Sequence, residues 1–242
     1  MYKGLKIGLS IPAHNEEELI INTIKSVEKY VDFITVVDDK SLDNTSNVVK
    51  ILQKNESRLH LITHKKNTGI GGSIIDAHKY NISQGADILV VIAGDDQMDQ
   101  TQMYRLLDSI LDGNDYAKGN RLDHKKELKY MPFIRKIGNI IASYVFKITI
   151  GYWSISDPLN GYTALKVSSY NKLNKQNIGT GFEFELSVLG ELSMINAKVV
   201  DVAIPARYGK EVSDIKIIRD AKRMSETLLK IMGRRAKEFI KL

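Results

Sequence analysis

Carboxylate side chains follow an apolar run in the middle of the chain. Residues Ile88 to Ala93 are apolar, and Gly94-Asp95-Asp96-Gln97-Met98-Asp99 comes directly after them. A short uninterrupted apolar run is typical of a strand buried on both faces, so we expect the acids just beyond its carboxyl end, where open α/β sheets bind ligands. Oxygen ligands there could hold a metal ion and a nucleotide diphosphate. The segment equally fits a polar turn in which Asp99 or Thr101 caps a helix.

Two earlier apolar runs end in polar clusters as well. Ile7 to Ile11 leads into Pro12-Ala13-His14-Asn15-Glu16-Glu17, and Phe33 to Val37 leads into Asp38-Asp39-Lys40-Ser41. Alone, the first cluster indicates only a helix start, while a carboxylate in the second could accept hydrogen bonds from a base or a ribose. In a doubly wound sheet the three strand ends converge on one crevice, which favours a binding site.

Two glycine-containing segments each leave two interpretations open. Asn67-Thr68-Gly69-Ile70-Gly71-Gly72-Ser73 could cradle an anion, but it lacks the spacing of dinucleotide and P-loop motifs, so close helix-to-sheet packing is favoured. In Gly179-Thr180-Gly181-Phe182-Glu183-Phe184-Glu185, two acids flank an aromatic residue at the start of a helix. They are either functional carboxylates or acids favoured by the helix dipole.

The composition excludes several kinds of chemistry. The chain has no cysteine, so disulfides, thiolate catalysis and thiolate-bound zinc are excluded, and any metal must be held by oxygen or imidazole. The five histidines show no zinc-binding spacing and no serine lies in a nucleophile elbow, which disfavours hydrolase triads.

Strand and helix patterns alternate through the first half of the chain. Strands are predicted at Ile7 to Ile11, Phe33 to Val37, Leu59 to Ile62, Ile88 to Ile92 and Tyr116 to Lys118. Helices are predicted at Glu17 to Tyr30, Thr45 to Lys54, Ile70 to Ser83 and Thr101 to Leu111. This rhythm predicts an α/β fold with a single, mostly parallel, Rossmann-like sheet flanked by helices.

After Arg121 the rhythm changes. We predict a long helix at Pro132 to Ile150, a turn at Asp157 to Gly161, a helix at Phe182 to Leu192 and a strand at Lys198 to Ile204. These later elements are expected to wall the site and contact an acceptor.

A basic amphipathic helix is predicted from Ser213 to the end, which divides the chain into a domain at 1–212 and a tail at 213–242. Asp214 to Leu242 has nine basic and four acidic residues, or +5 of the total +6. Such a helix could bind a membrane surface, pack on the domain or form an oligomer contact. We expect no leader, no transmembrane segment and no nucleic-acid partner, hence a cytoplasmic protein, with the inner face of the membrane as a candidate location.

Seven pieces of the chain, in order, resemble the motifs of family 2 glycosyltransferases. The pieces are Ile11 to Glu16, Val37 to Thr45, Asn67 to Gly72, Asp95 to Asp99, Gly119 to Arg121, Asp157 to Thr163, and Gly181 to Glu185. The resemblance is to the branch that contains dolichol-phosphate mannose synthase and related polyprenyl-phosphate glycosyltransferases. It implies a GT-A fold, a UDP- or GDP-linked sugar donor and Mg²⁺ or Mn²⁺. It also implies transfer with inversion at the anomeric carbon to a polyprenyl phosphate or a saccharide hydroxyl.

The resemblance also implies roles for individual residues. Around the base and ribose it places Pro12, His14, Glu16, Val37 and Asp39; on phosphate groups, Arg121 and Arg135; and in a basic loop over the donor, Arg207 and Lys210. Asp95 and Gln97 would ligate the divalent ion. Ala93 stands where relatives have the first acid of a D-x-D motif, so Asp96 or water would complete the metal shell.

The acceptor decides whether a base is needed. A polyprenyl phosphate is already an anion, whereas a hydroxyl requires a base, for which Asp157, Glu183 and Glu185 are the candidates. Asp95, through the metal, and Arg121 would stabilise the departing diphosphate. Two alternatives stay open: a nucleotide-sugar-binding protein without turnover, suggested by Ala93, and a nicotinamide-dependent oxidoreductase, suggested only by the α/β rhythm.

Overall fold

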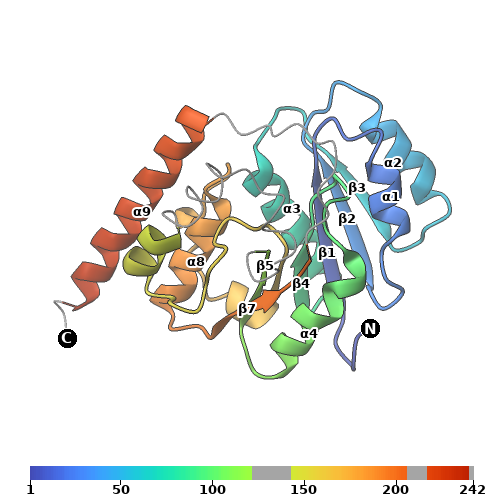
Figure 1. Ribbon diagram of the computed structural model, residues 1–242. Helices are drawn as coiled ribbons and strands as arrows, with labels where there is room; N and C mark the ends of the chain where they lie inside the picture. Colours follow the sequence, from blue (N-terminus) through green and yellow to red (C-terminus); the bar gives the residue numbers. More distant parts are fainter. Residues whose placement is uncertain (122–142, 206–216, 240–242) are drawn as a thin grey trace.

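A computed structural model describes residues 1–121, 143–205 and 217–239 of the chain (Figure 1). Within these residues one seven-stranded sheet has the order β3-β2-β1-β4-β6-β5-β7. The strands are β1 (Ile7–Ala13), β2 (Phe33–Asp38), β3 (Leu59–Thr63), β4 (Ile88–Val91), β5 (Tyr116–Asn120), β6 (Thr163–Lys166) and β7 (Val199–Ala203). Only β6 runs antiparallel to its described neighbours, β4 and β5. The mostly parallel sheet predicted from the sequence is confirmed.

Helices cover both faces of the sheet (Figure 1). They are α1 (Ile20–Lys25), α2 (Thr45–Gln53), α3 (Ile70–Ser83), η1 (Gln100–Gln102), α4 (Met103–Leu111), α7 (Val167–Tyr170), η2 (Lys175–Asn177), α8 (Phe184–Met194) and α9 (Ile217–Phe239). Alternate strand residues face opposite sides, so Val90 joins a core with α1, α2 and α4, while Leu89 joins a second core with α3 and α8.

The C-terminal helix α9 packs against α8. Ile231 is buried against Gly190, where a Cβ would lie 2.5 Å from Ile231 Cδ1, so glycine permits the close approach. Arg234 forms an ion pair with the buried Glu191, and Arg235 donates a hydrogen bond of 2.8 Å to the carbonyl of Thr149. The predicted start of this helix at Ser213 lies outside the described residues. No described helix has the length and apolarity needed to cross a membrane.

The predicted helix at Glu17 to Tyr30 is wrong in extent, because α1 spans only Ile20–Lys25. The preceding residues form a turn in which Asn15 has a φ of 58° and the amide of Glu17 donates to Asp43 Oδ2 at 3.1 Å. Of the predicted helix at Pro132 to Ile150, only 143–150 is described, and it is helical. β6 and α7 were not predicted from the sequence.

Candidate active site

Polar segments from several strands meet at one edge of the sheet. The register pairs Ala13 at the end of β1 with Asp38 at the end of β2, and Ser10 with Val91 at the end of β4. β6 is antiparallel, so its first residue, Thr163, pairs with Val91 at this same edge. The predicted convergence of three strand ends is therefore confirmed, and β5 and the segment before β6 extend the edge.

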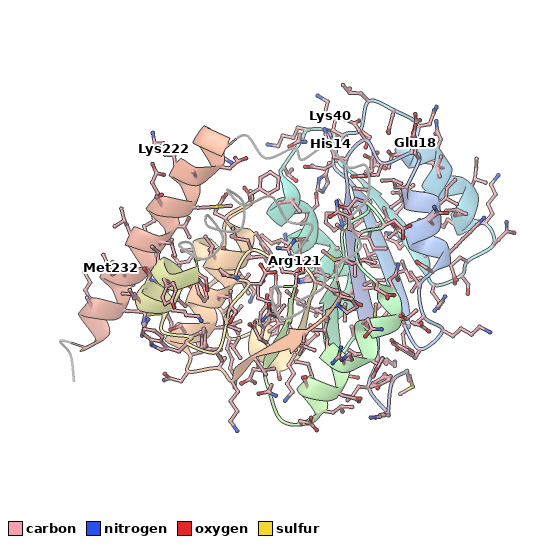
Figure 2. The ribbon with its side chains drawn as sticks, in the orientation of Figure 1. His14, Glu18, Lys40, Arg121, Lys222 and Met232 are labelled. Atoms are coloured by element: carbon pink, nitrogen blue, oxygen red, sulfur yellow. The ribbon has the colours of Figure 1, made fainter. Side chains whose placement is uncertain are left out.

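The turns after β1 and β2 are fastened to each other. The amide of Asn15 donates to Ser41 Oγ at 2.9 Å, and the amide of Leu42 returns a bond of 2.8 Å to Asn15 Oδ1. The amide of Glu16 donates to Thr45 Oγ1 at 2.8 Å. These bonds form a rim on which the side chains of His14 and Glu16 are partly exposed, and Figure 2 shows His14 there near Lys40. Two other residues expected near the nucleotide, Pro12 and Val37, are buried at the strand ends.

Asp39 is engaged by the glycine-rich loop. Its Oδ1 accepts hydrogen bonds from His64 Nδ1 at 2.8 Å and the Thr68 amide at 2.7 Å, and its Oδ2 accepts from the Gly69 amide at 2.8 Å. The Thr68 hydroxyl adds a fourth bond of 3.0 Å. Three of these bonds end on Oδ1 and one on Oδ2, so both carboxylate oxygens are engaged. Asp39 therefore orders the loop, while its backbone carbonyl contacts His14 Nδ1 at 3.0 Å.

The glycines of this loop permit close packing, although the partner differs from the predicted one. The Gly72 amide donates to the carbonyl of Thr180 at 3.0 Å. A Cβ on Gly69, whose φ is +85°, would lie 2.5 Å from that same oxygen, and a Cβ on Gly71 would lie 2.5 Å from the carbonyl of Gly179. The glycines thus approach the segment before α8, while the rest of α3 packs against β1 and β2 as predicted.

Oxygen donors cluster in the turn after β4. Asp95 Oδ1 accepts a hydrogen bond from the Gln97 amide at 3.1 Å, and Asp96 lies between them with a φ of 57°. Asp99 caps η1 by accepting from the Thr101 amide at 3.1 Å, as the turn interpretation predicted. Ala93 offers no ligand, and its amide faces Met98 Sδ at 3.4 Å.

These donors fit a hard divalent ion with an incomplete protein shell. In residues 1–121, 143–205 and 217–239, no group of three or more His, Asp or Glu could hold a metal ion. The oxygen ligands that this turn carries are the two carboxylates of Asp95 and Asp96 and the side-chain amide oxygen of Gln97. Mg²⁺ commonly binds through one or two carboxylates together with waters and substrate phosphates, so the donor set suits it.

Arg121 and Asp157 form a two-pronged ion pair at the end of β5. Nε of the guanidinium lies 2.7 Å from Asp157 Oδ2 and NH2 lies 3.0 Å from Oδ1. The Asp157 side chain is only 3% exposed, whereas that of Arg121 is 24% exposed. The buried carboxylate therefore holds the arginine by one edge of its guanidinium, and Figure 2 labels Arg121 in the middle of the molecule.

The two glutamates before and within α8 are both tied to the protein. Glu183 Oε1 accepts from the Gly181 amide at 3.1 Å, while its buried Oε2 has no hydrogen-bond partner among the described residues. Glu185 Oε2 accepts from Lys118 Nζ at 2.8 Å and from the Tyr116 hydroxyl at 2.6 Å. Sequence reasoning missed Lys118, although a lone lysine within a short, otherwise uncharged strand was a usable signal. Arg135, Arg207 and Lys210 lie outside the described residues.

Comparisons with known proteins agree with this geometry. Residues 9–173 match the profile of the family described as glycosyl transferase family 2. A UDP-N-acetylglucosamine–dolichyl-phosphate N-acetylglucosaminyltransferase of Methanococcus voltae is 32% identical over 184 residues, 70% of this chain and 73% of the relative. A dolichol-phosphate mannosyltransferase of Pyrococcus furiosus is 27% identical, over 85% of this chain and 57% of its own length.

A solved structure shares the fold. Glucosyl-3-phosphoglycerate synthase from Mycobacterium tuberculosis, in complex with Mn²⁺, UDP and glucosyl-3-phosphoglycerate, aligns with a TM-score of 0.70. The alignment covers 95% of this chain and 81% of that one at 18% sequence identity. At that level of identity the likeness concerns the fold alone.

Proposed function

The chain belongs to glycosyl transferase family 2 and has the GT-A fold, and on that premise we propose that it transfers a sugar, with inversion, from a nucleotide diphosphate sugar to a polyprenyl phosphate. The observation that carries the choice of acceptor is the state of the three candidate bases. Asp157 is engaged by Arg121 and Glu185 Oε2 by Lys118, while the oxygens left without a partner among the described residues, Glu183 Oε2 and Glu185 Oε1, are buried. A hydroxyl acceptor needs a base with a free lone pair, whereas a phosphate oxygen is already nucleophilic. The Methanococcus and Pyrococcus relatives are named for dolichyl-phosphate acceptors, which supports the same choice.

The proposed reaction depends on charge placed at the departing diphosphate. Asp95 and Gln97, with Asp96 or water, would hold a divalent ion, which when bound offsets negative charge on the diphosphate. Arg121 would offset the same charge and, being held by Asp157, would not need to reorient during the reaction.

The rim after β1 and β2 would receive the nucleotide. In this proposal His14 and Glu16 contact the base and ribose directly, because their side chains are partly exposed. Asp39 contributes by holding Thr68 and Gly69, not through a free carboxylate. The resemblance to the family assigns Arg135 to donor phosphate, and Arg207 with Lys210 to a loop over the donor.

A donor screen followed by a transfer assay tests the proposal. Thermal shift with UDP- and GDP-sugars, each with Mg²⁺ and Mn²⁺, should raise the melting temperature for one base only when metal is present. UDP-N-acetylglucosamine and dolichyl phosphate are the first pair to assay for a lipid-linked product. Transfer to a saccharide hydroxyl but not to lipid phosphate would overturn the acceptor. Metal-dependent binding without turnover on any acceptor would indicate a binding protein, and binding of NAD in place of nucleotide sugars an oxidoreductase.

A basic and apolar surface would bring the enzyme to its lipid acceptor at the cytoplasmic face of the membrane. In helix 143–150, Ile148 is 69% exposed and Tyr144 is also exposed, and Trp153 follows at 64%. Leu229 and Met232 are exposed on α9, which adjoins this helix through the Arg235–Thr149 hydrogen bond (Figure 1). Exposed apolar side chains among basic residues are typical of a membrane-surface contact.

Point substitutions test this surface better than deletion, because deleting α9 would uncover the core around Ile231. Ile148→Ser with Trp153→Ser should reduce sedimentation with vesicles that contain anionic lipid, while binding of UDP stays unchanged. Ile51→Ser is the matched control, since Ile51 is 61% exposed beside lysines on α2. Equal sedimentation of all variants would refute membrane contact, and loss of a dimer in the double variant would identify an oligomer interface instead.

A further inference from the structure

A lysine is fully buried in the sheet, where a strand residue is usually apolar. Lys118 on β5 pairs in the register with Thr163 on β6 and Asp201 on β7. Its Nζ donates to Glu185 Oε2 at 2.8 Å and to the backbone carbonyl of Asn160. A buried ammonium group is costly unless paired, and an apolar pair of similar volume is often equally or more stable. Fold stability therefore does not by itself explain this ion pair.

The carbonyl that Lys118 contacts belongs to the turn that carries Asp157. Asn160 Nδ2 donates to the carbonyl of Gly119 at 2.7 Å, and its backbone amide donates to the carbonyl of Asp157 at 3.3 Å. Lys118, Gly119 and Arg121, at and just after the end of β5, therefore all bond to this turn. The position of the Asp157 carboxylate thus depends on bonds made by Lys118.

The other end of the ion pair lies in the first turn of α8. Glu185 Oε2 also accepts from the Tyr116 hydroxyl at 2.6 Å, and burial together with the neighbouring Glu185 raises the pKa of Tyr116 well above its ordinary value. Tyr116 therefore stays protonated and donates. Lys118 therefore connects α8, through Glu185, to the turn that orients Arg121. The segment before α8 also packs on the glycine-rich loop.

We propose that Lys118 and Glu185 are positioning residues, which fix the 157–162 turn and, through Asp157, the direction of the Arg121 guanidinium. The inference rests on the proposed function for its kinetic consequence, but not for its geometric one. It assigns Glu185 to orientation of the arginine rather than to general-base catalysis. In this pair the buried Lys118 ammonium contacts the Glu185 carboxylate, and it positions the turn by donating a hydrogen bond to the backbone carbonyl of Asn160.

A mutant cycle with Arg121 tests the proposal by kinetics. Lys118→Met should lower kcat for UDP-N-acetylglucosamine turnover up to about tenfold, with donor KM changed less than about threefold. In an Arg121→Met background the same change should cost less than about twofold, because the residue through which it acts is gone. Lys118→Met with Glu185→Gln removes both charges, so it should recover stability without recovering kcat.

The matched control is Glu191→Gln, which makes the same change to a buried, paired carboxylate six positions along α8. It should lower the melting temperature and leave kcat unchanged. An equal loss of kcat from Lys118→Met in the presence and absence of Arg121 would overturn the proposal, as would a loss in Glu191→Gln of the same size.

Nuclear magnetic resonance supplies a readout that does not need turnover. The Arg121 Nε–H, which donates to Asp157 at 2.7 Å, should exchange slowly with water in the wild type. It should exchange about tenfold faster in the variant that combines Lys118→Met with Glu185→Gln. The signal is assigned by its loss in Arg121→Lys. Unchanged exchange would refute the positioning role. If the wild type transfers no sugar, the proposed function fails while this measurement still decides the inference.

Discussion

Replacing Arg121 by methionine strips the Asp157 carboxylate of its cation while leaving it buried. Two charge-assisted hydrogen bonds of 2.7 and 3.0 Å are lost. Breaking a fully buried pair typically costs about 3–5 kcal/mol, but water can enter where the 24%-exposed arginine stood, so we expect about 2–3 kcal/mol. For a chain of this length that corresponds to a fall of roughly 4–12 °C in melting temperature.

Activity and stability should separate across a small set of variants. Arg121→Met should lower kcat/KM about 10²- to 10³-fold, as expected for one electrostatic group at a developing charge. Arg121→Lys keeps the charge but cannot form the two-pronged contact, so it should recover part of the rate and less of the stability. Asp157→Asn should lower kcat/KM only about tenfold, because the guanidinium remains but is less well held.

Urea titration and initial-rate assays at several pH values distinguish the roles. If Asp157 were a general base, Asp157→Asn would abolish transfer and remove the acid limb of the pH–rate profile. If Arg121 served only as a partner for Asp157, Arg121→Met would lose stability and keep kcat/KM. Either result would refute the assignment of Arg121 to the diphosphate. A coupling energy of about 1–3 kcal/mol in the stability cycle is the expected signature of the pair.

Three further predictions follow from the same geometry. Gly69→Ala should destabilise the fold and weaken UDP binding, because φ is +85° and the new Cβ meets the carbonyl of Thr180; calorimetry checks both. Ala93→Asp adds a carboxylate to those of Asp95 and Asp96, so Mn²⁺-dependent UDP affinity should rise about tenfold by titration, and no change would show that Asp96 or water already completes the shell. Burial raises the pKa of Asp201 to about 6, above its unfolded value of 3.8. Between these two pH values the native state binds more protons than the unfolded state, so the free energy of unfolding falls as the pH rises. Burial lowers the pKa of His78 to about 3, below its unfolded value of 6.5, so the free energy of unfolding falls as the pH drops from 6.5 toward 3. The Asp201 carboxyl opposes this loss, because its protonation stabilises the native state at low pH. Asp201→Asn should therefore lose stability more steeply on acidification than the wild type in urea titrations.

The sheet could be predicted from the sequence because its strands are the most patterned part of the chain. β1, β2 and β4 are apolar runs bounded by polar residues, and their buried side chains match that pattern. β6 was missed because Thr163–Lys166 is short, and antiparallel insertion into a parallel sheet leaves no periodic signal over four residues. α1 was overextended because Asn15 and its neighbours bond to the turn after β2, a non-local competition that helix propensity does not reveal.

The site was predicted less completely than the sheet for a related reason. The sequence predicted Asp39 after a strand, Asp157 in a turn and Glu185 at the start of a helix, but the state of a carboxylate depends on its partners. Those partners are remote in sequence: Asp39 is bonded 29 residues ahead, Asp157 is paired 36 residues back, and Glu185 is paired 67 residues back. Only Asp99, whose partner Thr101 is two positions away, could be assigned its capping role from local sequence.

The engaged carboxylates have a consequence for what the site can accept. Asp39 is occupied by amides and His64, Asp157 by a guanidinium, and Glu185 by an ammonium group. The negative charge of these three carboxylates is therefore largely internal, while the side chain of Arg121 is 24% exposed. A neutral hydroxyl would find Asp157 already paired and the unpartnered oxygens of Glu183 and Glu185 buried, but a phosphate would bring its own nucleophilic charge toward a cationic group. Replacing the phosphate acceptor by the corresponding free polyprenol should therefore abolish transfer rather than slow it.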